Sequence, residues 1–166
     1  NAFPNALSVE GIKKTRGILE ATFSIQGKLL TVFGNHWPSQ ANPNVTRLIA
    51  AQTLLKVMKN HNNPYIVAGD FNTERNDRQN GIKDILMDPN SADVLMDAEG
   101  EYVGEESFDL KFKKGTHFYR GRWNSLDKIL LPKRYLKGYC KERICINPFF
   151  DSFEIVYEDF MLEEIS

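Results

Sequence analysis

The sequence has few cysteines, no long apolar run and almost no net charge. Only two of its 166 residues are cysteines, and a chain of this length buries roughly 70% of its unfolded surface, enough for a core without disulfides. No apolar run approaches the roughly 20 residues of a membrane-spanning helix, and no low-complexity tract is present. With 42% apolar and 26% charged residues, the chain is not collagen-like, coiled-coil, disordered or transmembrane, and its length predicts one globular domain.

The two cysteines, Cys140 and Cys145, are close together in the sequence. This spacing is compatible with a disulfide between adjacent strands in an oxidising compartment. It is equally compatible with two buried free thiols. The sequence leaves both alternatives open.

The charged residues are unevenly distributed, although the formal net charge is only -1. Residues 111–143 hold eleven Lys and Arg against two acids, a balance of +9, with aromatic residues interleaved. Residues 69–109 hold twelve acids against three bases, a balance of -9. The basic, aromatic-rich stretch suits an anionic and partly planar ligand such as nucleic acid. The alternative is a solvated surface that acids from elsewhere in the chain neutralise.

Hydrophobic patterns predict a mixed order of strands and helices. Residues 17–25 and 29–33, around a turn at Gly27-Lys28, predict a β-hairpin. Helical spacing predicts a helix over 47–59, capped by Asn44 or Thr46, and a short helix over 81–87 that an acidic loop region follows as far as Asp109. Further strands are expected over 65–68, 116–120, 126–131, 144–146 and 153–157. This order predicts a mixed sheet or a pair of sheets with helices outside.

Three polar clusters lie at the ends or beginnings of predicted strands. They are Asn35-His36-Trp37, Asp70-Phe71-Asn72 and Trp123-Asn124-Ser125-Leu126-Asp127. Strands that end at a shared edge of a sheet bring residues that are distant in sequence to one point. We therefore expect the three clusters to converge.

Each cluster also has a purely structural interpretation. His36 is compatible with a solvated loop histidine, and Asp70 with a turn, because Gly, Asp and Asn are turn formers. Asp70 nevertheless ends a strand that should be buried, where a carboxylate needs a partner. Asp127 begins an apolar strand within the basic stretch, and its structural alternative is a salt bridge. None of these signals is specific when taken singly.

Together, the clusters resemble the endonuclease/exonuclease/phosphatase superfamily. The matching segments are N-H-W-P-S at 35–39, G-D-F-N at 69–72 and W-N-S-L-D-K-I at 123–129, in the family's order and with compatible spacing. The resemblance covers nearly the whole chain and is greatest to bacterial, often secreted, members, which favours a secreted or periplasmic location. It implies a deoxyribonuclease I-like α/β fold, in which a two-sheet β-sandwich is flanked by helices as four α/β/β/α layers.

The family hydrolyses phosphate esters with an in-line water and a divalent metal, usually Mg²⁺, with Mn²⁺ or Ca²⁺ as alternatives. The resemblance implies that Asp70 orients or deprotonates the water and that Asp70 and Asn72 contact the metal. It implies that Asn72 and His36 stabilise charge on the phosphoryl oxygens, with His36 near the leaving oxygen. Asp127 matches an aspartate that supports a histidine. The residues expected to contact substrate are Asn35, Arg120, Trp123 and Asn124.

The resemblance also implies that residues 1–166 are part of a larger domain. The family's upstream strands, which carry an Asn and the principal metal-ligating Glu, and its C-terminal Ser-Asp-His strand have no match in this sequence. Asp70 and Asn72 alone would bind Mg²⁺ weakly. We expect a phosphodiesterase or nuclease that acts on nucleic acid. The alternatives are a phospholipid or inositol-phosphate phosphoesterase, and a non-catalytic piece that needs a complementing chain or self-associates.

Overall fold

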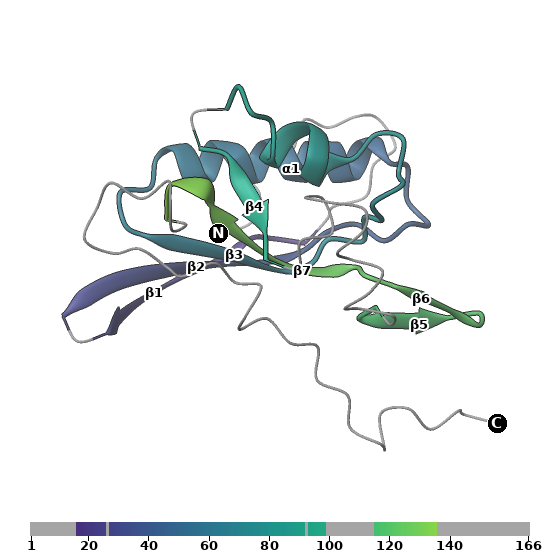
Figure 1. Ribbon diagram of the computed structural model, residues 1–166, viewed down its shortest axis with the longest axis horizontal. Helices are drawn as coiled ribbons and strands as arrows, with labels where there is room; N and C mark the ends of the chain where they lie inside the picture. The colour runs from purple at the N-terminus through teal and green to yellow at the C-terminus, as the bar shows by residue number, and fades with distance from the viewer. Residues whose placement is uncertain (1–15, 26, 92, 99–114, 136–166) are drawn as a thin grey trace, which may run out of the picture.

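Seven strands and one long helix make up the part of the chain that the computed structural model describes, residues 16–25, 27–91, 93–98 and 115–135. The elements are β1 (Leu19–Ile25), β2 (Lys28–His36), α1 (Val45–Lys59), β3 (Tyr65–Asp70), η1 (Ile82–Leu86), β4 (Leu95–Asp97), β5 (His117–Tyr119), β6 (Arg122–Asn124), β7 (Asp127–Pro132) and η2 (Lys133–Tyr135). They form a five-stranded sheet in the order β1-β2-β3-β7-β4 and a two-stranded sheet, β5-β6 (Figure 1). None of the helices in these ranges is long and apolar enough to cross a membrane.

The five-stranded sheet is mixed, as the sequence predicts. β1 and β2 form the expected antiparallel hairpin, whereas β2 and β3 are parallel because α1 connects them. β7 is antiparallel to both β3 and β4. The strands β2, β3 and β7 therefore lie side by side, although β7 follows β3 by more than fifty residues.

Helix α1 covers one face of this sheet and closes the core. It begins two residues before the predicted range, and its buried side chains include Ala50, Ala51, Leu54 and Met58. These pack with buried residues of β2, β3 and β7, namely Phe33, Val67 and Leu130. The helical spacing that predicts this helix also places Leu48 and Leu55 among its apolar positions, and both are only half-buried. Each fully buried apolar side chain contributes roughly 1.5–3 kcal/mol to folding.

Two strands lie where the sequence predicts none. β4 falls in the predicted acidic loop, and it exists because Leu95, Met96 and Asp97 pair with the distant strand β7. β6 falls between the strands predicted at 116–120 and 126–131 and pairs with β5 through a tight turn at Arg120 and Gly121, both with positive φ (49° and 75°). The predicted helix at 81–87 is a single π-helical turn, η1. The strands predicted at 144–146 and 153–157, and both cysteines, lie outside the described residues.

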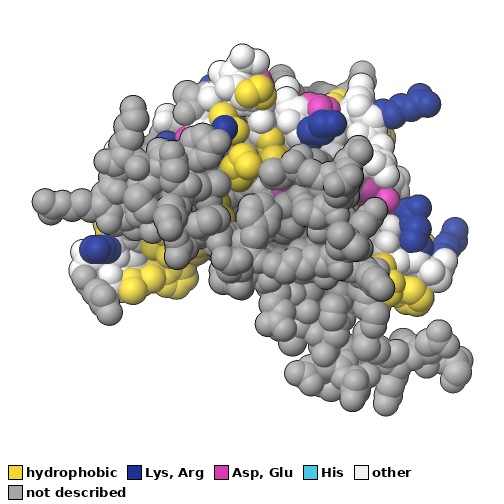
Figure 2. Space-filling model, viewed as in Figure 1, with side chains coloured by type: hydrophobic (Ala, Val, Ile, Leu, Met, Phe, Trp, Pro, Cys, Tyr) yellow, Lys and Arg dark blue, Asp and Glu magenta, His cyan; other side chains and the backbone are white. Residues whose placement is uncertain are grey.

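The predicted α/β class, with two sheets and helices on an outer face, is confirmed. Figure 1 shows α1 and η1 on the same side of the five-stranded sheet, with the β5-β6 hairpin projecting beyond the start of β7. The opposite face of the sheet carries large exposed apolar side chains: Leu19, Phe23, Ile25 and Ile129. Figure 2 shows hydrophobic side chains gathered around the β1-β2 hairpin.

Candidate active site

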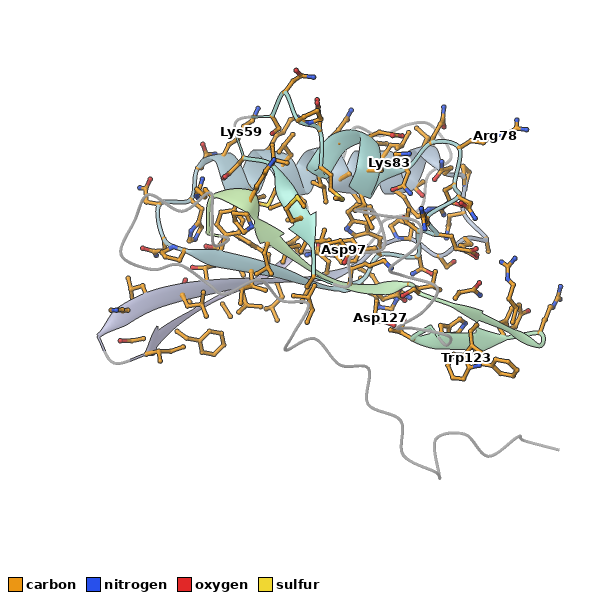
Figure 3. The ribbon with its side chains drawn as sticks, in the orientation of Figure 1. Lys59, Arg78, Lys83, Asp97, Trp123 and Asp127 are labelled. Atoms are coloured by element: carbon orange, nitrogen blue, oxygen red, sulfur yellow. The ribbon has the colours of Figure 1, made fainter. Side chains whose placement is uncertain are left out.

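Three of the predicted catalytic residues form one row across the sheet. His36 at the end of β2 is in register with Asp70 at the end of β3, and Asp70 is in register with Asp127 at the start of β7. Register partners on neighbouring strands point to the same face of a pleated sheet, so the three side chains share the face that α1 does not cover. The Asp127 side chain is exposed at the start of β7 (Figure 3).

His36 and Asp70 face each other directly. The distance between His36 Nε2 and Asp70 Oδ2 is 3.5 Å, and the two side chains are 50% and 32% exposed. An imidazole next to a carboxylate at a solvent-accessible edge can exchange protons with a ligand or with water. The row therefore combines a proton acceptor with a donor on one face.

A tight turn fixes the carboxylate of Asp70. Its Oδ1 accepts a hydrogen bond of 2.8 Å from the backbone N–H of Asn72. Asn72 has a φ of 49°, a left-handed conformation that Asn tolerates better than most residues. The Asn72 side chain is buried, and its Nδ2 donates to the Trp37 carbonyl at 3.1 Å. Asn72 thus orients Asp70 and joins the ends of β2 and β3, with its amide nitrogen facing the backbone of Trp37.

Gly69 permits the close approach of β2 and β3 beside the row. Its φ is +136°, and a Cβ at this position would lie 1.9 Å from the carbonyl oxygen of Asn35. No side chain fits there, so the motif needs glycine immediately before Asp70 for steric reasons.

Asn35, a predicted substrate contact, lies on the other face of the sheet from the row. It is in register with Gly69 and is buried, with Nδ2 donating to the Phe33 carbonyl at 2.9 Å. Its Oδ1 accepts from Trp37 Nε1 at 3.3 Å, and the Trp37 ring packs edge-on against Phe71. Asn35 therefore supports Trp37 beneath the site and is not brought together with His36.

The beginning of β7 is held by Thr116. Its Oγ1 accepts hydrogen bonds from the backbone N–H groups of Leu126 and Asp127, at 3.2 and 3.1 Å. The Leu126 carbonyl in turn accepts from Phe71 N at 2.9 Å. These bonds fix Asp127 against the end of β3.

The other predicted substrate contacts lie on the β5-β6 hairpin. Trp123 and Asn124 are half-buried in β6, and Arg120 is exposed at the turn with its guanidinium 5.2 Å from the centre of the Tyr119 ring. Phe118 and Tyr119 are also exposed. Figure 2 shows basic and hydrophobic side chains together at this end of the molecule, and Figure 3 shows Trp123 further out along the hairpin than Asp127.

The described part of the basic stretch is neutralised in several places. Arg122 pairs with Glu74, and Arg134 pairs with Asp93, so acids of the 69–109 segment compensate these bases. Lys128 is buried and not on the surface. The structural interpretation of the charge run therefore holds for Arg122 and Arg134, while Arg120 remains exposed beside the Tyr119 ring.

The described residues do not by themselves fit a Mg²⁺ site. Within them, no group of three or more His, Cys, Asp and Glu side chains is close enough to hold an ion. Mg²⁺ needs near-octahedral oxygen coordination, and Asp70 already uses one oxygen for the Asn72 N–H. The metal remains a prediction from the resemblance.

Glu74 is a feature of the site that the sequence did not single out. Glu74 follows Asp70 by four residues. Its Oε1 and Oε2 accept hydrogen bonds from Arg122 Nη2 at 3.0 and 3.1 Å. It also accepts from Gln40 Nε2 at 3.2 Å. The only sequence signal is an acid just beyond the G-D-F-N segment, and its basic partner 48 residues later cannot be identified from spacing.

Most of the chain matches a known protein family. The model described as "Endonuclease/Exonuclease/phosphatase family" matches residues 5–164. A mannosyl-6-phosphatase from Bacteroides thetaiotaomicron VPI-5482 is 20% identical, with a TM-score of 0.42, over 64% of this chain and 38% of that one. An endonuclease/exonuclease/phosphatase family protein from Bacteroides thetaiotaomicron is 15% identical, with a TM-score of 0.36, over 64% of this chain and 36% of that one. The chain thus spans well under half the length of these structures. No match was found among curated proteins.

Proposed function

The chain belongs to the endonuclease/exonuclease/phosphatase family, and on that basis we propose that the row of His36, Asp70 and Asp127 hydrolyses a phosphate ester. The observation that carries the proposal is the register of the three residues across β2, β3 and β7 on one face of the sheet. Three segments far apart in sequence meet there with an imidazole and two carboxylates.

In the proposed reaction, Asp70 holds the attacking water. The Asn72 N–H fixes one oxygen of its carboxylate, which leaves Oδ2, on the His36 side, to accept a proton. The water oxygen bonds to phosphorus as the ester P–O bond breaks. His36 donates a hydrogen bond to a phosphoryl oxygen or to the leaving oxygen, where negative charge develops.

We propose Mg²⁺ as the cofactor because of the charge in the row. Asp70 and Asp127 are direct register partners, and two like charges in that position are destabilising. A cation near the row would offset this repulsion and supply charge stabilisation to the phosphoryl group.

We propose nucleic acid as the substrate because of the hairpin. Arg120 offers a guanidinium for a phosphate, and exposed Phe118 and Tyr119 offer rings on which bases stack. Nucleic-acid binding of this kind weakens as salt rises, because each phosphate contact releases counterions. Binding that does not depend on salt would favour a phospholipid or an inositol phosphate.

We also propose that a second chain, either a complementing partner or another copy of this one, covers the sheet face that carries Leu19, Phe23 and Ile25. Exposed apolar side chains on one face of a sheet are typical of a surface that is covered in the working molecule. Size-exclusion chromatography tests this proposal. A well-behaved monomer of these 166 residues that cleaves phosphodiesters with Mg²⁺ would contradict it.

The function is tested with the purified protein and a panel of substrates, in Mg²⁺ and in EDTA. The panel holds bis(4-nitrophenyl) phosphate, single- and double-stranded DNA oligonucleotides, sphingomyelin vesicles and an inositol polyphosphate. We expect Mg²⁺-dependent cleavage of the diester and of DNA, lost in Asp70→Ala and His36→Ala. Asp88→Asn, which removes a carboxylate far from the row in sequence, is the control. Undiminished turnover in both row variants would refute the assigned roles, and no turnover of any substrate would favour a non-catalytic protein.

A further inference from the structure

Glu74 joins three segments around the edge of the sheet that carries the row. Its carboxylate binds Arg122 in β6 through both oxygens and Gln40 in the loop after β2 through Oε1. The Glu74 backbone is itself held: its N–H donates to Asp77 Oδ2 at 3.2 Å, and its carbonyl accepts from Asn80 Nδ2 at 3.0 Å. The acid is therefore an anchored point to which the other two segments attach.

The β5-β6 hairpin needs such an attachment. A two-stranded ribbon is marginally stable on its own, and this one is a separate sheet that projects beyond β7. Thr116 fixes the base of the hairpin at the start of β7. Arg122 is close to the turn at the far end, so its ion pair with Glu74 restrains the part of the hairpin that Thr116 does not reach.

We propose that Glu74 is a positioning residue that holds the β5-β6 hairpin beside the row, so that its arginine and aromatic side chains meet the non-reacting part of the substrate. This inference rests on the proposed function. Glu74 is not in register with His36 or Asp127, and its side chain acts on the hairpin and not on the phosphoryl group. Its loss should therefore weaken binding of a long substrate and leave the chemical step intact.

The kinetic test compares Glu74→Gln with wild type on a DNA 12-mer and on bis(4-nitrophenyl) phosphate. Exposed ion pairs contribute about 0.2–1 kcal/mol, which corresponds to a rise in KM for DNA of up to about fivefold. The kcat for DNA and both parameters for the small diester should stay close to wild type. The charge reversal Glu74→Arg with Arg122→Glu should recover part of the lost affinity, whereas either reversal alone should not. Asp88→Asn, which keeps the acceptor for Asn90 and removes one charge, is the matched control.

A second measurement reports whether the β5-β6 hairpin is held in place, and it does not require the protein to turn over a substrate. The tryptophan fluorescence of the protein minus that of Trp123→Phe is the emission of Trp123 in β6. Quenching of this emission by acrylamide reports how exposed Trp123 is. We expect this component to be quenched more strongly in Glu74→Gln, with no change in the melting temperature.

The two measurements separate the inference from the function. A wild-type protein that cleaves neither substrate, but whose Trp123 becomes more accessible in Glu74→Gln, would overturn the proposed function and retain the attachment. Active protein with unchanged KM, unchanged quenching and no recovery on charge reversal would overturn the inference. A fall in kcat for both substrates would also overturn it, because Glu74 would then act on the chemical step.

Discussion

The two faces of the five-stranded sheet differ in what they contribute. On the face under α1, Phe33, Val67 and Leu130 are fully buried and form the core. On the other face, alternate residues of the same strands place His36, Asp70 and Asp127 in a row. Because side chains alternate along a strand, stability and reactivity are carried by residues that are neighbours in sequence. Substitutions on the face under α1 should therefore affect stability, and substitutions in the row on the other face should affect activity.

The largest expected effect is on the exposed face, at Asp70. Asp70→Asn keeps the side-chain shape and an acceptor for the Asn72 N–H, but an amide cannot take a proton from water. Because general-base catalysis contributes about 10²–10⁴ to the rate, we expect kcat to fall by about that factor. The melting temperature should change little.

Steady-state kinetics on bis(4-nitrophenyl) phosphate measure the kcat of Asp70→Asn, and thermal denaturation measures its melting temperature. A variant with normal kcat would mean that the row is not the catalytic centre. A variant that loses stability together with activity would mean that the two faces are not independent at Asp70.

Gly69→Ala should lower both the stability and the activity, because Gly69 belongs to the face that α1 covers and immediately precedes Asp70 in the row. The new Cβ would meet the Asn35 carbonyl at 1.9 Å, and a φ of +136° strains any residue with a side chain. We expect a loss of about 3 kcal/mol in the free energy of unfolding, with reduced activity. Urea denaturation checks the stability.

Gly34→Ala is the matched control for Gly69→Ala. A Cβ at Gly34 would make an ordinary contact of 3.5 Å with the Leu19 side chain, and its φ is not in the strained range. We expect a change within about 1 kcal/mol, in either direction. Equal losses in both variants would show that the close approach of β2 and β3 at Asn35 is not what makes glycine necessary.

A pair of valine substitutions compares the faces directly. Val67 in β3 is fully buried under α1, whereas Val32 in β2 is half-buried on the other face. Truncation to Ala removes the same atoms at both sites, so the difference reports the packing around each. We expect Val67→Ala to cost about 2 kcal/mol and Val32→Ala less than about 1 kcal/mol. Similar costs in chemical denaturation would show that the second face is also packed.

The core and the row could be predicted from the sequence because both depend on local sequence patterns. The apolar runs of β2 and β3 and the spacing of α1 predict their elements, and the strand ends carry the polar clusters that meet at Asp70. The orientation of Asn35 follows from the alternation of side chains along a strand, since Asn35 precedes His36 in β2 and therefore faces the other side of the sheet. The left-handed turn at Asn72 and the parallel register of β2 and β3 could not be predicted, because both emerge only in three dimensions.

Long-range pairing explains the remaining differences. β4 has three residues and forms only because β7, some thirty residues later, provides its partner. The ion pair of Glu74 and Arg122 likewise joins segments that no periodicity connects. Contacts of this kind depend on which strands become neighbours, and local patterns do not contain that information.

The smallest expected effect is at Phe23, on the exposed face and away from the row. Phe23 is 51% exposed and pairs with Leu30, and Thr, which is β-branched, also has a high preference for strands. In the 166-residue chain without the proposed cover, we expect Phe23→Thr to change the free energy of unfolding by about 0.5 kcal/mol or less, because surface substitutions without a specific role seldom do more. A loss clearly above about 1 kcal/mol in urea denaturation would show that the proposed cover over Phe23 is already present in the purified protein. The second face would then be a covered core like the first, with the row at its open end.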